Sequence, residues 1–122
     1  MQLVFADSEV AHVQAQGDTL TVLFAAAAIA QGPGGEAGYL PGLTLAFRQA
    51  RWQGDPAACI GRLREGELSD GISRLTRLEL PFDGPGPWRA ELAFAQGSRL
   101  LVDAQRVTAL PGDAPLRPSY AC

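Results

Sequence analysis

The stretch that decides the fold class runs from residue 88 to residue 104 and reads WRAELAFAQGSRLLVDA. Its first half places apolar side chains at every second position, the period of a β-strand with one buried face: Trp88, Ala90, Leu92 and Phe94. The same period returns after residues 96–98, from Leu100 onward. We therefore predict a β-hairpin with a three-residue loop, in which Phe94 faces Leu100 and Gly97 or Ser98 adopts the left-handed conformation.

Similar patterns recur along the chain at short intervals, separated by Gly, Pro and Asp. Residues 10–15 and 19–24 predict a second hairpin around Gln16-Gly17, and residues 43–47 predict a further strand. Residues 78–82 predict another, which Pro81 marks as an edge strand or as a strand that ends there.

Two segments are also compatible with a helix. Residues 24–30 are almost all alanine, which has high helix propensity, but they continue a strand pattern. Residues 70–77 carry apolar side chains at helical spacing, but Asp70-Gly71 is also a typical hairpin turn. We favour a long strand for the first segment and a hairpin for the second.

These patterns predict an all-β fold, an antiparallel β-sandwich or small barrel of about seven to nine strands built mainly from hairpins. We expect one domain over residues 1–110, interrupted by a Gly/Pro-rich loop at 31–42. A loose, Pro-rich C-terminal tail is expected over residues 111–122.

Composition and charge argue against a nucleic-acid or membrane partner. The 122 residues are 47% hydrophobic and carry a net charge of −3, which suits a globular protein and argues against a nucleic-acid partner. The first seven residues lack a basic region typical of a signal peptide, and the most apolar run, residues 20–30, is too short to cross a bilayer. We therefore expect a cytoplasmic protein with no membrane partner and with Cys59 and Cys122 reduced.

The usual catalytic and cofactor motifs do not assemble. Residues 32–37 match the letters of a dinucleotide fingerprint, but residues 38–42 cannot form the helix that such a site needs. His12 is the sole histidine and is expected to face solvent, and Cys59 is expected to be a small buried side chain. We predict no cofactor and no catalytic or metal-binding residues.

Arginine is the most informative residue type. All ten basic residues are Arg, which can reflect the bias of a GC-rich, bacterial-like genome or the recognition of an anion. Five residues could contact an anion or a partner protein. Arg48, Arg51 and Trp52 cluster at one strand end, and Arg62 and Arg64 share one strand face if that segment is extended. The alternative is that these arginines pair across strands with Glu65, Glu67 or Glu79 and leave no positive patch.

Two hypotheses about function remain. The first is a non-catalytic β-domain that associates with a protein partner or with its own copy, since no catalytic set assembles and strand edges must be covered. The second is a small-molecule-binding domain or minor enzyme with a pocket between its sheets.

Overall fold

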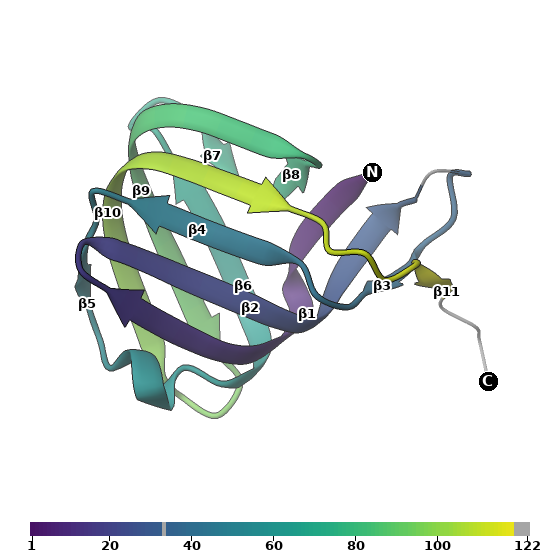
Figure 1. Cartoon of the computed structure of the whole chain (residues 1–122), viewed down its shortest axis with the longest axis horizontal. Helices are drawn as coiled ribbons and strands as arrows, with labels where there is room; N and C mark the ends of the chain where they lie inside the picture. Colours follow the sequence, from purple (N-terminus) through teal and green to yellow (C-terminus); the bar gives the residue numbers. More distant parts are fainter. Residues whose placement is uncertain (33, 119–122) are drawn as a thin grey trace.

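The computed structural model describes residues 1–32 and 34–118. Figure 1 shows an almost wholly β-stranded chain, with one short 3₁₀ turn. In chain order the elements are β1 (Gln2–Gln16), β2 (Thr19–Gln31), β3 (Gly38–Leu40), β4 (Thr44–Arg48), β5 (Arg51–Gln53), η1 (Pro56–Ala58), β6 (Gly61–Ser69), β7 (Arg74–Leu75), β8 (Arg77–Glu79), β9 (Phe82–Phe94), β10 (Arg99–Leu110) and β11 (Arg117–Pro118).

Six of these strands close into an antiparallel barrel. The pairing runs β1–β2–β4–β10–β9–β6 and returns to β1. The all-β prediction is therefore correct, and the architecture is a barrel with extra strands. The described strands number more than nine because several pieces of two or three residues extend the long ones, as β5 does where it pairs with β10 beyond the end of β4.

The interior of the barrel is filled by side chains that alternate inward along each strand. The largest of the fully buried side chains are Phe5, Phe24, Phe47 and Phe94. Packing is close: a Cβ added to Gly66 would lie 2.8 Å from the Cβ of Phe5. Because the interior is occupied by aromatic and aliphatic groups, outward-facing side chains are the ones available to contact other molecules.

A wide bulge in β1 divides the strand into two parts that pair with different strands, β8 and β6. Val4 pairs with Ala28 and Glu9 with Ala26, so four residues of β1 lie opposite Ala27 alone. The Ser8 hydroxyl donates to the Val4 carbonyl at 2.6 Å and accepts from the Ala28 amide at 2.8 Å. These bonds replace ladder bonds that the bulge removes. The first part of β1 pairs with β8 and the second part with β6.

The β9–β10 hairpin forms, but the predicted register is wrong by two residues. Leu92, not Phe94, lies opposite Leu100, because the three-residue loop starts one residue earlier than predicted, at residues 95–97, and the Phe94 amide donates to the Ser98 carbonyl at 2.9 Å. The Gly97 amide donates to the Phe94 carbonyl at 3.0 Å, and Gly97 has a positive φ of 110°, as predicted. A two-residue shift keeps every side chain on the same face, so the buried set is unchanged.

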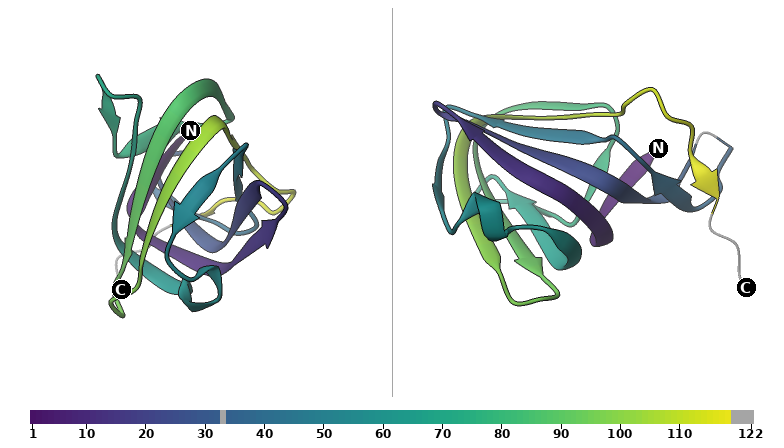
Figure 2. Two further views of the ribbon diagram at one scale, coloured as in Figure 1. Left: turned by 90° about the vertical axis from the view of Figure 1, so that its left-hand side faces the viewer. Right: turned by 60° about the horizontal axis from the view of Figure 1, so that its bottom comes forward.

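Both ambiguous segments are resolved in favour of β-structure. Residues 24–30 belong to β2, and residues 65–75 form the β6–β7 hairpin. The Asp70 carboxylate closes its turn by accepting from the amides of Ile72 at 2.9 Å and Ser73 at 2.7 Å. Figure 2 (left) shows this part of the chain projecting from the barrel, and Ile72 at its tip is 96% exposed.

The expected loop at 31–42 is wrong for three of its residues. Residues 38–40 form β3, because Tyr39 pairs with Ala28 and continues the sheet beyond β2. Residues 117–118 then add β11 to the free edge of β3 (Figure 2, right). The expectation for Cys122 falls outside the described residues, whereas the predicted strand end at Pro81 is confirmed, since β8 stops before it and β9 starts after it.

Candidate functional site

One outer surface of the barrel brings together charged side chains that are far apart in the sequence. It covers β4 and β5, then β10, β9 and β6, and we call it the charged face. Strand alternation decides its membership, since residues between the core positions point outward. Cross-strand pairing then sets neighbours: Arg48 lies opposite Arg106, and Asp103 lies between Arg51 and Arg89.

Positive charge dominates the end of this face near β4 and β5. We call it the arginine end and define it by six residues: Arg48, Arg51, Arg89, Arg106, Asp83 and Asp103. Arg106 holds the Asp83 carboxylate with two hydrogen bonds, both 2.8 Å long. Arg89 donates to Asp103 at 3.2 Å. The two aspartates therefore form ion pairs with two of the four guanidinium groups, those of Arg89 and Arg106.

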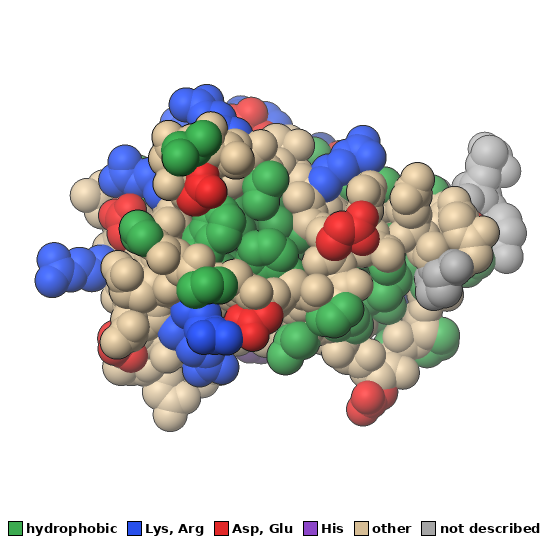
Figure 3. Space-filling model, turned by 90° about the horizontal axis from the view of Figure 1, so that it is seen from above, with side chains coloured by type: hydrophobic (Ala, Val, Ile, Leu, Met, Phe, Trp, Pro, Cys, Tyr) green, Lys and Arg blue, Asp and Glu red, His purple; other side chains and the backbone are tan. Residues whose placement is uncertain are grey.

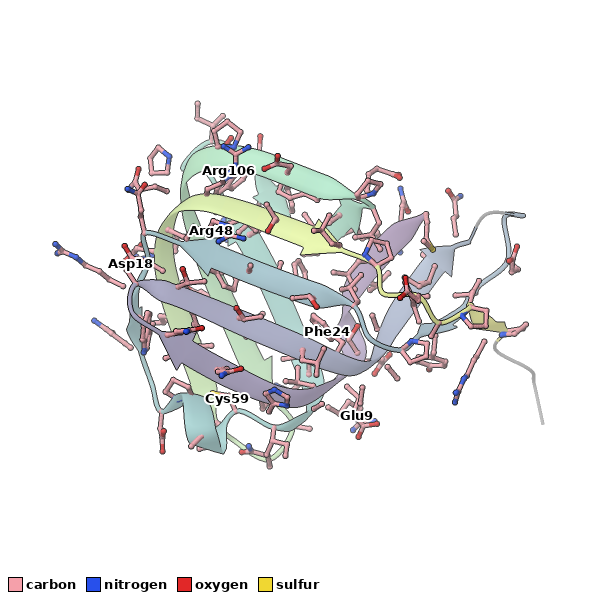
Figure 4. The ribbon with its side chains drawn as sticks, viewed as in Figure 1. Glu9, Asp18, Phe24, Arg48, Cys59 and Arg106 are labelled. Carbon is pink, nitrogen blue, oxygen red and sulfur yellow. The ribbon has the colours of Figure 1, made fainter. Side chains whose placement is uncertain are left out.

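The other two guanidinium groups, those of Arg48 and Arg51, are exposed and have no ion-pair partner within residues 1–32 and 34–118. A bend holds both beside β10. Gln49 has a positive φ of 48°, and the Ala50 amide donates to the Asp18 carbonyl at 2.8 Å. Figure 4 shows Arg48 close to Arg106 on the neighbouring strand. Two unpaired arginines on rigid strands are suited to binding carboxylates.

The pKa of Asp83 reflects the positive potential of the arginine end. Hydrogen bonds from Arg106 are the main cause that lowers the pKa of Asp83, against a smaller opposing effect of desolvation. The positive charges of Arg106 and Arg48 lower the same pKa further. Arg48 therefore contributes to the positive potential at Asp83 although it forms no ion pair with it.

The end of the charged face nearer the β9–β10 loop is hollow and acidic. A groove of about 180 Å³ lies over β6, β9 and β10, and we call it the acidic groove. Its outward-facing lining comprises Glu65, Glu67, Thr76, Glu91, Arg99 and Leu101. Glu67 and Glu91 are direct cross-strand partners, an arrangement in which like charges repel. Arg99 approaches Glu91 only to 3.8 Å, so the groove keeps an excess of negative charge.

The structure divides the five predicted contact residues into two groups. Arg48 and Arg51 belong to the arginine end, whereas Arg62 and Arg64 lie on β6, on the far side of β9 and β10. Arg62 is opposite Glu9, and Arg64 is the extra residue of a bulge. Trp52 is half-buried and packs against the core opposite Val102, so it does not share a face with the arginines.

Sequence reasoning missed six charged contributors to the charged face: Asp83, Arg89, Glu91, Arg99, Asp103 and Arg106. Asp83 lies outside the alternation of residues 88–104, and that alternation breaks after Ala104, where Gln105 and Arg106 are both exposed. The outward orientation of the other four could be read from the alternation. Their neighbours could not, because these depend on pairing with β4, β5 and β6, which are distant in the sequence.

The sole histidine and Cys59 lie outside the charged face. His12 is exposed, as expected, and residues 1–32 and 34–118 contain no group of three or more metal-ligating side chains. Cys59 is 1% exposed. Burial raises the pKa of the Cys59 thiol, and the charge of Asp55 raises it further, so the thiol is neutral and a poor nucleophile.

Two other surface features are apolar. A shallow hollow of about 170 Å³ lies beside the β1 bulge and is lined mainly by small side chains and by Tyr39. Figure 3 shows hydrophobic side chains gathered in the middle of the view from above, bordered by charged ones. Half-buried Phe82 and Trp88 pack edge to face on the inner side of β9, with ring centres 5.9 Å apart.

In the part of the chain that the structure describes, no helix is long and apolar enough to span a membrane. Comparisons with models of protein families, with curated proteins and with solved structures give no match for this chain.

Proposed function

We propose that this chain is a non-catalytic β-barrel domain that mediates protein–protein association through its charged face. The observation that carries the proposal is the pair of unpaired guanidinium groups, Arg48 and Arg51, held beside β10 on the same face as an acidic groove. A protein partner with carboxylates would complete the ion pairs that the barrel leaves open.

The alternative function, small-molecule binding or catalysis in a pocket between the sheets, has less support. The two hollows described above lie on the outside of the barrel, and the buried thiol is not activated. A nucleic-acid partner would meet an overall charge of −3 and an acidic groove next to the arginines. We retain the cytoplasmic location as part of this proposal.

The test is a titration of the ¹⁵N-labelled chain with a hexaglutamate peptide at low salt, followed by two-dimensional NMR. We expect shifts in the amide signals of β4, β5 and β10 that disappear at high salt. The Arg48→Glu/Arg51→Glu variant should lose them. The matched control Arg74→Glu/Arg77→Glu changes the charge equally at exposed positions on β7 and β8 and should keep them.

Either of two results would overturn the proposal. One is the absence of shifts at millimolar peptide, or identical shifts in the Arg48→Glu/Arg51→Glu variant. The other is that a single-stranded DNA of equal charge shifts the same signals at physiological salt while the peptide does not, which would indicate a nucleic-acid site instead.

A further inference from the structure

We infer that the partner of the charged face is a second copy of this chain, bound face to face about a two-fold axis. The inference rests on the proposed function and specifies the partner. Both halves of a complementary pair are present on one molecule, since the arginine end and the acidic groove adjoin along β9 and β10, where the row of Arg89 and Asp103 lies next to the row of Glu91 and Leu101. In a two-fold dimer each complementary contact is made twice.

The charges of the two ends match in sign and amount. In the arginine end, four arginines and two aspartates leave an excess of two positive charges. In the acidic groove, three glutamates and one arginine leave an excess of two negative charges. Docking the arginine end of each copy onto the groove of the other would neutralise both without any further molecule.

The local geometry also favours an arginine as the occupant of the groove. Glu67 and Glu91 face one another directly across β6 and β9, and Arg99 reaches Glu91 only at 3.8 Å. A guanidinium group from outside would relieve this repulsion by donating hydrogen bonds to both carboxylates. Arg48 and Arg51 are the guanidinium groups of the arginine end that lack such a partner in the described chain.

The side of the acidic groove next to the arginine end supplies an apolar contact. Leu101 is half-buried on the outside of β10 and lines the acidic groove. In the register of the sheet it lies between Gln53 of β5 and Glu91 of β9, so charged and polar groups surround it. An apolar centre with a charged rim is the usual composition of a protein interface.

Sedimentation velocity on charge-reversed full-length chains tests the inference. Arg48→Glu/Arg51→Glu makes both ends acidic, and Glu65→Arg/Glu67→Arg makes both ends basic. We expect the unaltered chain to dimerise in a salt-sensitive way, and each variant alone to dimerise about tenfold or more weakly, because like charges then meet at both contacts. Mixing the two variants should restore a dimer with one chain of each kind, and the fourfold variant carrying both changes should again form a homodimer.

Each remaining outcome has a defined meaning. The control Arg74→Glu/Arg77→Glu should dimerise like the unaltered chain, and thermal melting of every variant should show an intact fold. A chain that stays monomeric at millimolar concentration, a dimer insensitive to both double changes, or failure of the mixture to restore the dimer would overturn the inference. If the monomer still binds hexaglutamate, the proposed function stands and only the identity of the partner is wrong.

Discussion

Replacing Ser8 by alanine should destabilise the barrel much more than the loss of one oxygen atom suggests. Ser8 is fully buried, and it is the one buried polar residue in the part of the chain that the structure describes. Its hydroxyl bridges the two sides of the β1 bulge, with bonds of 2.6 Å to the Val4 carbonyl and 2.8 Å from the Ala28 amide. Alanine would leave both backbone groups buried without partners.

The structure sets the size of this effect. An unsatisfied buried donor or acceptor costs about 1–3 kcal/mol, so the loss of both bonds should lower the free energy of unfolding by about 3 kcal/mol. In a chain of this length that corresponds to a fall of about 10 °C in the melting temperature. Urea unfolding followed by circular dichroism gives the free energy, and hydrogen exchange should show a less protected Ala28 amide.

The matched control is Ser73→Ala, which removes the same atom from an exposed turn whose bonds to Asp70 use backbone amides. Its effect should stay within about 0.5 kcal/mol. If Ser8→Ala also changed stability by less than about 0.5 kcal/mol, the bridging hydroxyl would not hold the bulge, and this explanation of how β1 changes neighbours would be refuted.

Three further predictions concern single sites. Gly54→Ala should destabilise more than Gly17→Ala in urea unfolding, because both positions have positive φ but only at Gly54 would the new Cβ collide with the Arg99 carbonyl; equal losses would contradict this. A carboxyl NMR titration should place the pKa of Asp83 below its usual range, and the Arg106→Gln variant should raise that pKa. Because the pKa of Asp83 is lowered in the folded state, the ion pair should stabilise the fold at neutral pH, and this stabilisation should be lost as pH falls through the folded pKa. An unchanged Asp83 titration in the variant would count against this explanation. In a variant without the C-terminal thiol, Cys59 should react with a thiol reagent more slowly in the native than in the urea-unfolded chain at neutral pH, since burial keeps it protonated and covered; equal rates would show an accessible thiolate.

The sequence could predict the fold class because strand periodicity is local information. Alternation in residues 88–104 identifies the buried face of both strands, and the structure buries the predicted side chains such as Leu92, Phe94 and Leu100. The register was beyond reach for a physical reason: a shift of two residues preserves both faces, so hydrophobicity does not distinguish the two pairings.

The charged face shows the same limit. Arg48 and Arg51 could be singled out because they lie close together in the sequence near the end of a strand pattern. Two cross-strand neighbours could not be predicted, because they depend on pairing between strands more than twenty residues apart in the sequence. These are the pairs Arg48–Arg106 and Glu67–Glu91. Trp52 follows Arg51 directly in the sequence, but consecutive strand residues point to opposite faces, so its side chain does not join those of the arginines.

The central claim is that the arginine end of one copy contacts the acidic groove of another. The most direct measurement is an isotope-filtered nuclear Overhauser experiment on a mixture of labelled and unlabelled chains at millimolar concentration. We expect intermolecular contacts from the side-chain protons of Arg48 or Arg51 to those of Glu65 or Glu67. Intermolecular contacts confined to another surface, such as the hollow beside the β1 bulge that Tyr39 lines, would contradict it, as would the absence of any intermolecular contact.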